Sequence, residues 1–485
     1  MAKKIFALGV FLLAAGFARA QGPASVPQTT PAANYLGPAV VPLSPVQPQN
    51  PYAGSVSAGP VAGVLQLSLD DAVNRALKQN LGALLSSEAT AAARSDRLRQ
   101  LANLLPNITT LTSVNMRQLD LTTFGFKFNF SGEKIPSIVA PFGYFDTRAY
   151  FSQTLFDWEQ ISRVRSTNAN LQSAQLSYKD ARDLVVQAAG TNYFATIAAA
   201  ARVETAQAQV NTAQALYKQA SDQLNAGVTA SIDALRAQVE LQTRQQQLIA
   251  ARNNLDKQKL VLARVIGLPP GQQFAITAQA RFDPLSGPTL EEALQRAYAT
   301  RADFKAAETQ LRAAELARKA AQAERYPTLD FDADYGDIGI TPGHSHGTFD
   351  LAGVLRVPVF QGGRVRADIL QADASVAQSR SELENLRGQI DQDVRNAFLD
   401  LQSSSDQVKV EQSTVELANQ TLQQAQDRFK AGVTDNIEVV QAQESVASAN
   451  ESFIESLYNF NVAKISLARA VGLAEDNVKQ FFKGY

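Results

Sequence analysis

Apolar residues recur every seven positions along several long stretches of the chain. In residues 241–262 the series is made of leucines, and 205 positions later it returns with other apolar side chains. A sustained seven-residue period is typical of helices packed as coiled coils, although a soluble antiparallel bundle has the same period. The stretches 157–225 and 363–430 carry matching series, so we predict two helices, each roughly 100 Å long at ~1.5 Å per residue. The positions are Leu241, Leu248, Leu255, Leu262; Val446, Phe453, Phe460, Leu467; Val203, Val210, Tyr217, Leu224; and Val408, Val415, Leu422, Phe429.

Strict alternation of apolar and polar residues marks a second kind of element. Between 329 and 335 apolar residues alternate with aspartates, and the stretches 349–357 and 145–155 have a similar period of two. This alternation predicts β-strands with one apolar and one polar face. Strands of a membrane barrel, with lipid outside and water inside, have this pattern, and so do strands of an ordinary half-buried sheet. The pattern alone leaves both possibilities open.

The predicted elements occur twice in the same order. Leu69-Asp-Asp-Ala-Val-Asn-Arg returns as Leu290-Glu-Glu-Ala-Leu-Gln-Arg, 221 positions later, and Gly227 returns as Gly432, 205 positions later. Each half therefore contains a helix, a β-hairpin, a long helix, a glycine turn and another helix, and the halves differ in length mainly within the hairpin. The predicted ranges are 68–105 and 289–326 for the first helix, 226–229 and 431–434 for the turn, and ends at Gly267 and Gly472 for the last helix.

The helix lengths predict how the halves are arranged. Two shorter helices placed end to end match one long helix, so they can run beside it along its whole length. The expected object is an elongated tube with sheet at one end, and its two repeats are residues 63–268 and 289–475. The linker 269–288 would form a belt where the short helices meet, and residues 476–485 would be a short tail.

The N-terminal residues are expected to be an export signal and a lead. Residues 1–20 have a charged head, an apolar run and a small-x-small cleavage pattern, which predicts a cleaved signal peptide. Residues 21–62 are rich in Pro, Ser, Gly and Ala without periodicity, which predicts an extended, disordered segment. No later stretch has 18 uninterrupted apolar residues, so we expect no membrane-spanning helix.

Composition excludes several classes of function. There is no cysteine, which removes disulfides, thiol catalysis and thiolate metal sites. The formal net charge of −1 gives no general basic field for nucleic acid. No combination of nucleophile and base, phosphate loop or metal-spaced cluster is present, so we expect no catalysis, no cofactor and no metal. The only histidines, His344 and His346, are interpreted as residues of a hairpin tip.

The strand count bears on assembly. Four strands cannot close a barrel, because spanning barrels have about eight or more. Exposed strand edges are not tolerated in lipid. If the predicted strands span a membrane, the chain must therefore form an oligomer. Two copies would supply eight strands, and three copies would supply twelve.

At this point the chain resembles the TolC-type outer-membrane efflux family. The resemblance rests on the order of elements, found twice, and on local motifs that extend over about residues 66–475. It implies a fold that is mostly α with a membrane β-barrel part: a homotrimer with a 12-stranded barrel in the cell outer membrane and a coiled-coil helical tunnel in the periplasm. It also implies an exit channel of a tripartite efflux or type I secretion system, with a periplasmic adaptor, an inner-membrane pump and outer-membrane lipid as partners. The motifs are Leu105-Pro106-Asn107, Leu155-Phe156-Asp157, Val359-Phe360-Gln361-Gly362-Gly363, the two Ala-Gly-Val-Thr turns and Val471-Gly472-Leu473.

The resemblance also implies a gate at the periplasmic tip. The family has a carboxylate pair one helical turn apart after the second glycine turn, and the matching residues here are Glu438 and Gln441, of which only the first is acidic. Thr434 stands where the family has a locking arginine, and Phe429 where it has a tyrosine. The acidic partner in the first repeat is kept as Asp233. We therefore expect a gate held mainly by coiled-coil packing, with one Glu438 ring at most, against the alternative of ordinary surface charge.

Two further sets of residues are candidates. The resemblance makes the turn residues Gly227, Val228, Gly432 and Val433 the expected adaptor contacts, and glycine at such a reversal also has a structural reason. On the second hairpin, four aspartates share the predicted lumen face, where they would make an acidic mouth or merely solvate a polar lumen. They are Asp330, Asp332, Asp334 and Asp350. The competing function is a coiled-coil scaffold or adhesin without a pore.

Overall fold

The computed structural model divides into two compact units. It describes residues 50–59, 63–124, 129–130, 133–134, 137–227, 230–278, 281–284, 289–434 and 436–475. The expected signal peptide, most of the Pro-rich lead and the C-terminal tail lie outside these residues. The described part of the first unit is Asn107–Phe151 with Asp332–Ala352, and the second unit comprises Gln47–Pro106, Ser152–Phe331 and Gly353–Tyr485.

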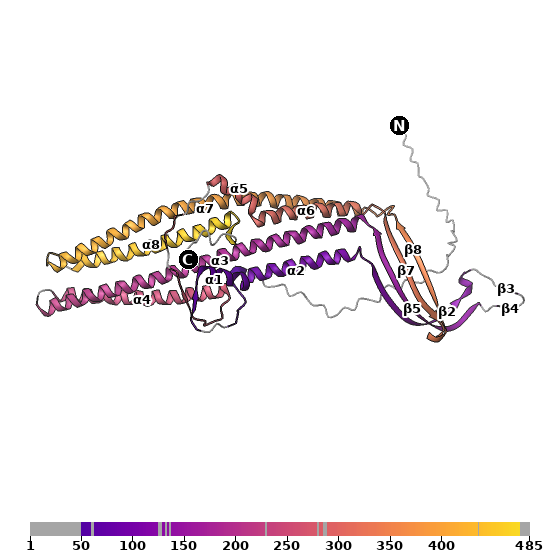
Figure 1. Cartoon of the computed structure of the whole chain (residues 1–485), viewed down its shortest axis with the longest axis horizontal. Coiled ribbons are helices and arrows are strands. Elements are labelled where there is room, and N and C mark those ends of the chain that lie inside the picture. Colours follow the sequence, from indigo (N-terminus) through magenta and orange to yellow (C-terminus); the bar gives the residue numbers. More distant parts are fainter. Residues whose placement is uncertain are drawn as a thin grey trace, which may run out of the picture. The chain divides into compact units, whose positions relative to one another are not determined.

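The first unit is built from strands. Four strands form one sheet in the order β2-β5-β7-β8, so β2 and β8 are its edges (Figure 1). A short antiparallel pair, β3 and β4, lies within the first hairpin. The alternating stretches are confirmed as strands. Their bounds are β2 Asn107–Asp120, β3 Asn129–Phe130, β4 Glu133–Lys134, β5 Ile138–Phe156, β7 Thr328–Gly339 and β8 Ser345–Arg356.

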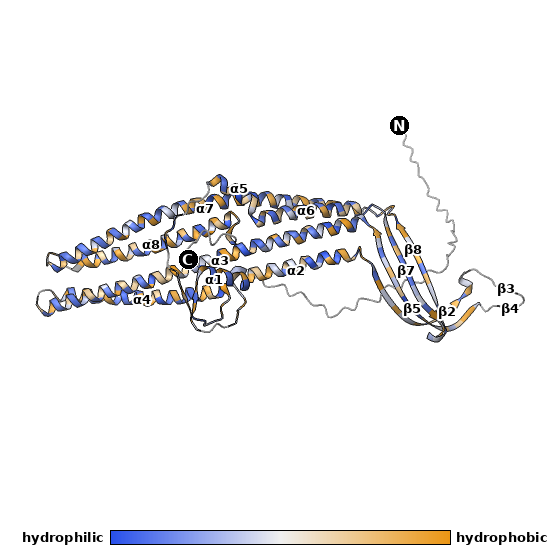
Figure 2. Cartoon of the chain, viewed as in Figure 1, coloured by the Kyte–Doolittle hydropathy of each residue, from blue (hydrophilic) through white to orange (hydrophobic). Residues whose placement is uncertain are grey.

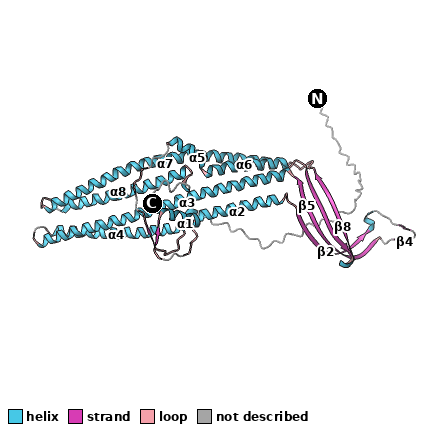
Figure 3. Ribbon diagram, viewed as in Figure 1, coloured by secondary structure: helices cyan, strands magenta, loops and turns pink. Residues whose placement is uncertain are grey.

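The second unit is mostly helical (Figure 3). Two long helices, α3 and α7, each pack along a partner that follows the glycine turn, α4 and α8 respectively, and α6 contacts both long helices. A small parallel pair, β1 (Leu65–Leu67) with β6 (Phe274–Ile276), joins segments far apart in sequence. The helices are α1 Leu69–Gln79, α2 Leu81–Ala102, α3 Trp158–Asn225, α4 Ser231–Ile266, α5 Leu290–Thr300, α6 Ala302–Ala323, α7 Arg364–Lys430 and α8 Asn436–Ala470.

The predicted continuous helices at 68–105 and 289–326 are wrong in one respect, because each is broken once. The first break is at Asn80, which is fully buried. Its amide donates to the carbonyl oxygens of Tyr52 and Val265, and its Oδ1 accepts from the Gly82 N–H at 2.9 Å, which caps α2. The second break is at Arg301, which is 4% exposed. A buried polar residue that bonds to distant segments outweighs helix continuity at these positions.

Side-chain caps and a left-handed glycine explain the helix ends that were predicted from the sequence. The Asp157 side chain accepts from the Gln160 N–H at 3.0 Å and caps α3. Thr289 and Glu292 form a capping box at the start of α5. Gly267 ends α4 with φ +75°, a left-handed conformation that only glycine adopts without strain.

The heptad positions are buried or half-buried. Leu241, Leu248 and Leu262 are all at most 8% exposed, and Val408 is fully buried. The largest cluster joins α1, α3 and α4 around Tyr193. The hydropathy colouring shows apolar residues scattered along each helix rather than gathered in one run (Figure 2).

One window of α3 is long and apolar enough to meet the criteria for a membrane span, although the sequence led us to expect no membrane-spanning helix. By length and mean hydropathy, 18 residues of this helix pass, and 56% of the window is buried inside the protein. The window passes on its average although polar residues interrupt it. A buried core helix meets the same criterion, and the core around Tyr193 accounts for its apolar character.

Candidate gate and docking surface at the helical tips

The two glycine turns have the same backbone geometry. Gly227 and Gly432 both adopt φ +71°, in the left-handed region. Each glycine N–H donates to the carbonyl oxygen three residues earlier, at 3.0 Å in the first turn and 3.1 Å in the second. Apart from adjoining residues, no described heavy atom lies within 4 Å of the place a Cβ would occupy. The backbone conformation, and not crowding, therefore requires glycine.

Three of the four expected docking residues lie in the described part of the chain. Gly227 and Gly432 are exposed, and Val433 is 69% exposed. Val228 lies outside the described residues. A single exposed apolar side chain is common on protein surfaces, so the exposure of Val433 permits contact with a partner but does not by itself indicate one.

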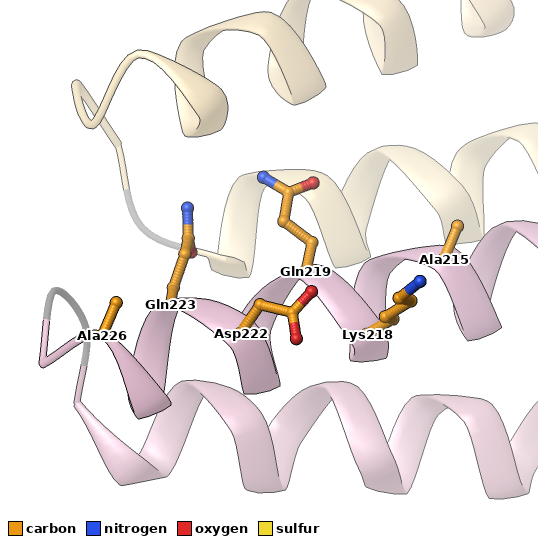
Figure 4. A pocket seen from close by; sticks show the side chains of 6 residues that line it. All are labelled: Ala215, Lys218, Gln219, Asp222, Gln223 and Ala226. Atoms are coloured by element: carbon orange, nitrogen blue, oxygen red, sulfur yellow. The ribbon is translucent and has the colours of Figure 1, made fainter.

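A shallow hollow of about 470 Å³ lies on the last turns of α3, next to the first glycine turn. Figure 4 shows the Gln219 and Gln223 side chains extending from one side of α3, with Lys218 and Asp222 beside them. Amide and charged groups of both signs make this surface polar and able to hydrogen-bond with a partner. The sequence reasoning missed this surface, because polar residues on a coiled coil look like an ordinary solvated face.

Glu438 lies in the first turn of α8 and faces Arg428, in the last turn of α7. Arg428 Nη2 and Glu438 Oε1 are 3.6 Å apart, and both side chains are about half exposed. Such an exposed pair contributes at most about 1 kcal/mol. Arg428 was missed from sequence, although a basic residue in the last turn of a helix complements the helix dipole and could have pointed to it.

The other gate candidates lie close to the turns. Gln441 is exposed, one turn after Glu438 on α8, and Thr434 is half-buried in the turn itself. Asp233 lies in the first turn of α4, 3.5 Å from Arg236 of the same helix. The Asp233–Arg236 pair therefore lies within one helix, whereas the Glu438–Arg428 pair joins two helices.

Phe429 is buried and is not part of a surface in the single chain. It is 6% exposed and packs in a cluster that joins all four helices near the tips. Its buried partners are contributed by α3, α4, α7 and α8, which places it in the seam that the heptads predicted. The members are Leu216, Ala220, Ala237, Ala425, Val439 and Ala442.

The aspartates of the second hairpin are partly neutralised. Asp334 is paired with Arg148 of β5, and Asp330 with Arg356 of β8. Asp332 and Asp350 form no ion pair with a described residue. The polar face of the strands is therefore less negative than four aspartates alone would make it.

Arg148 joins groups from three neighbouring strands. Its Nε lies 3.6 Å from Asp146 Oδ1 on β5, and its Nη2 donates to Thr348 Oγ1 on β8 at 2.7 Å. With Asp334 on β7, these contacts form a polar ladder across the sheet, and paired residues of this kind stabilise sheets. The arginine was noted in the sequence as a polar-face residue, but its partners could not be assigned without the strand order.

A second charged network lies between helices far from the tips. Arg469 Nη2 on α8 is 2.5 Å from Asp180 Oδ1 on α3 and 3.8 Å from Asp303 Oδ2 on α6. Burial raises the pKa of Asp180 to about 6, even though Arg469 favours the charged carboxylate. Arg301 holds the pKa of Asp303 below its ordinary value despite burial. No sequence pattern indicated this cluster, which joins residues from three separate helices.

Comparisons with known proteins agree with this architecture. The sequence profile described as "Outer membrane efflux protein" matches residues 72–268 and 293–473. The chain is 23% identical over 342 residues to "Outer membrane protein TolC" of Escherichia coli strain K12, covering 66% of this chain and 68% of that protein. It is 25% identical over 343 residues to "Alkaline protease secretion protein AprF" of Pseudomonas aeruginosa strain PAO1, covering 67% and 69%.

The fold is also similar to solved structures. The outer membrane protein VceC of Vibrio cholerae aligns with a TM-score of 0.70 at 17% identity, covering 83% of this chain and 96% of that chain. At this identity the likeness concerns the fold alone. The family profile matches well over half of the chain, in two segments that each contain one glycine turn. The chain therefore belongs to the outer membrane efflux protein family, and it is a transport channel of the outer membrane.

Proposed function

We propose that the chain forms a homotrimer whose twelve strands close a β-barrel in the outer membrane, above a periplasmic tunnel of helices. In this proposal residues 63–268 and 289–475 are the two repeats, and 269–288 is the linker between them. The assembly passes substrate outward from an adaptor and an inner-membrane pump, as the exit channel of a tripartite efflux or type I secretion system. It performs no catalysis of its own.

The observation that carries the proposal is a four-stranded sheet with two unpaired edges and an exposed apolar face. Ile108, Val114 and Met116 of β2 are 68%, 81% and 83% exposed, and Phe349 and Leu351 of β8 are 72% and 63% exposed. A soluble sheet with such a face would be prone to aggregate. In lipid the apolar face is solvated, but the edges must pair, and pairing β2 of one copy with β8 of the next closes the barrel.

The helical tips are the proposed gate and adaptor surface. The exposed turn residues Gly227, Gly432 and Val433 would contact the adaptor, together with the polar hollow on α3. Val228 belongs to the same proposed surface. Glu438 would place a ring of carboxylates at the periplasmic aperture, with Gln441, Thr434 and Asp233 around it and Phe429 in the packed seam behind.

The strand aspartates support a modified form of the acidic mouth. Asp332 and Asp350 would supply negative charge to the lumen, because Asp330 and Asp334 are paired with arginines. A polar lumen lined by both signs is solvated without strong selection for cations. We propose that selectivity, where present, arises at the tips.

A pair of lysine substitutions tests the barrel. Val114→Lys would place a charge on the lipid face and is expected to cost about 2–4 kcal/mol if the position lies near the bilayer midplane. Ser113→Lys, one residue away on the polar face, should be tolerated. The measurements are the mass of the detergent-purified assembly, the shift in migration between unheated and heated samples, and conductance in planar bilayers.

The expected result is a heat-sensitive assembly of three copies that conducts, with loss of assembly for Val114→Lys only. A soluble single copy that leaves the bilayer silent would contradict the proposal and favour the coiled-coil scaffold. Equal tolerance of both lysines would show that Val114 faces water.

A further inference from the structure

A polar hollow lies between α3, α4, α7 and α8, away from the proposed gate residues. Its volume is about 350 Å³, and α3, α4, α7 and α8 all contribute to its lining. Since a water molecule occupies about 30 Å³ in the liquid, the hollow has room for roughly ten waters or for a small solute. It lies wholly within one chain and within the helical unit.

The hollow lies between two apolar clusters. Toward the turns, Phe429 and its cluster close the space between the helices, and toward the other end Val408, Leu457 and Phe460 pack together on α7 and α8. Between these layers the lining residues are mainly polar, and they include Asn419 and Gln443. A coiled coil gains stability from apolar side chains in its seam, so a polar layer requires another reason.

Gln443 is the residue that most clearly needs a partner. It is 7% exposed and lines the hollow, and neither its Nε2 nor its Oε1 has a hydrogen-bond partner among the described residues. Leaving a buried amide unpaired costs about 1–3 kcal/mol. The contents of the hollow must therefore supply a donor, an acceptor or both.

Several side-chain oxygens in the lining of the hollow can accept hydrogen bonds. Thr212, Asn419 and Asn450 each donate to the carbonyl oxygen four residues earlier in their own helix, at 3.0, 2.8 and 2.8 Å. Each donation leaves the side-chain oxygen available to accept. Gln443 Oε1 adds a further acceptor, and its Nε2 would donate to water that enters with the ligand, so a ligand with N–H donors fits these oxygens.

The charge around the hollow is negative. Arg244 is 3% exposed, and its guanidinium already donates to Glu240 of its own helix and to Glu444 of α8, both at 2.6 Å. Glu204 also lines the hollow at its exposed side, and it forms no ion pair with a described residue. Of the two charged residues that line the hollow, Arg244 is already neutralised by glutamates outside the lining, so the carboxylate of Glu204 is the charge that a ligand would meet. This balance favours a cationic occupant.

We propose that the hollow binds a small organic cation with N–H donors, such as a linear aliphatic diamine. One ammonium group would bond to Gln443 Oε1 and to the oxygens of Asn419 and Asn450, and Glu204 would balance the charge. A bare metal ion is a poorer fit, because no group of three or more His, Cys, Asp or Glu residues gathers anywhere in the described ranges. The site is distinct from the gate and adds a ligand to the wall of the tunnel.

The occupant would touch both helical hairpins at once. Gln443 and Asn450 belong to α8 and Asn419 to α7, while Glu204 and Thr212 belong to α3. Binding would therefore stabilise the packing of the two hairpins against each other, and the melting temperature should rise with ligand concentration.

The test measures binding of 1,4-diaminobutane to the full-length protein in detergent by titration calorimetry, with ionic strength held constant. Magnesium chloride and n-butylamine serve as comparison probes. Gln443→Leu removes the buried amide and should weaken diamine binding about tenfold, whereas Gln443→Glu adds a carboxylate of similar shape and should tighten it. The control is Gln238, the equivalent position in the first repeat, which is exposed on α4. Gln238→Leu and Gln238→Glu should leave binding unchanged.

Saturable diamine binding that responds in opposite directions to the two Gln443 substitutions supports the site. Absence of saturable binding means that the hollow holds only water and overturns the proposal. Magnesium binding that matches the diamine, or equal effects of the Gln238 and Gln443 substitutions, shows unspecific surface charge and overturns it as well. Bilayer conductance is measured in parallel. A trimer that conducts but does not bind the diamine would leave the proposed channel function intact and would overturn the binding site alone.

Discussion

Removal of the Phe429 ring should loosen the helical tips more than any other single truncation near them. The side chain is 6% exposed, and four of its six buried partners are alanines. Phe→Ala in a packed interior costs about 3–5 kcal/mol, and the cost is highest where neighbours cannot collapse into the cavity. Alanine methyl groups cannot extend into the space. We therefore expect a loss near 4 kcal/mol for Phe429→Ala, borne by the cluster that joins the four helices.

The loss of stability expected for Phe429→Ala sets how much faster the backbone amides at the tips should exchange with solvent. At about 1.4 kcal/mol per factor of ten, 4 kcal/mol corresponds to about a thousandfold rise in the local opening equilibrium. Hydrogen exchange with mass spectrometry should show this rise in peptides from the ends of α7 and α8. Peptides around Ile390 and Val394, which belong to a separate cluster, should keep their protection.

Two substitutions serve as controls for the ring. Phe429→Leu keeps most of the volume and should cost less than about 1.5 kcal/mol. Leu417→Ala removes a side chain of the same helix that is 61% exposed and should change little. If Phe429→Ala exchanges no faster at the tips than Leu417→Ala, then packing in the described cluster does not hold the tips and the reasoning is refuted.

Three other predictions follow from the site. Glu438→Gln should lower single-channel conductance and cation preference with little change in stability, since its exposed pair with Arg428 contributes at most about 1 kcal/mol; unchanged conductance and selectivity would dismiss the carboxylate ring. Burial raises the pKa of Asp180 to about 6, so the native state binds more protons than the unfolded state between about pH 4 and 6, and stability from this group falls as pH rises through that window. As pH rises from 4 to 7, the free energy of unfolding of Asp180→Asn should therefore increase by up to about 3 kcal/mol relative to that of the wild type. Urea unfolding measures both, and parallel pH curves for the two proteins would contradict this. Gly432→Ala should cost about 1–2 kcal/mol because of its positive φ, whereas Gly388→Ala, equally uncrowded but inside α7, should stabilise by about 0.5–1 kcal/mol; the same sign for both in thermal unfolding would show that conformation is not the cause.

The long helices and the strands were predictable because their causes are local. Asp157 caps α3, the glycine at 227 reverses the chain, and the alternation in 329–335 defines a strand, each within a few residues. The heptads also predicted that Phe429 and Val408 would be interior, because a seam position is a property of spacing alone.

The helix breaks could not be predicted because their causes are distant. Asn80 bonds to Val265, 185 residues away, and Arg301 bonds to Asp393 on α7 at 3.0 Å. From sequence, both look like polar residues on a solvated helical face. Gln443 is a similar case, since its burial depends on four helices meeting at one level.

The contacts at the helical tips could be predicted only in part, because some of their causes are local and others are distant in sequence. The carboxylate of Glu438 was identified through the resemblance, but its partner Arg428 was not, because it stands on the preceding helix across the turn. The family's locking residues are replaced at 434 and 441, and the structure places another charge nearby. Which residue pairs with Glu438 depends on how the two helices are rotated about each other, and spacing alone does not fix that rotation.

The two tips show what a duplication within one chain makes possible. Both turns have φ +71° at glycine, and both tips have an ion pair inside a single helix, yet among the described residues only the second tip has an ion pair that joins two helices. In a ring built from single-repeat copies, every mutation would change all tips at once. In the proposed trimer, two repeats in one chain allow alternate tips to differ in sequence, so one set can specialise without changing the other.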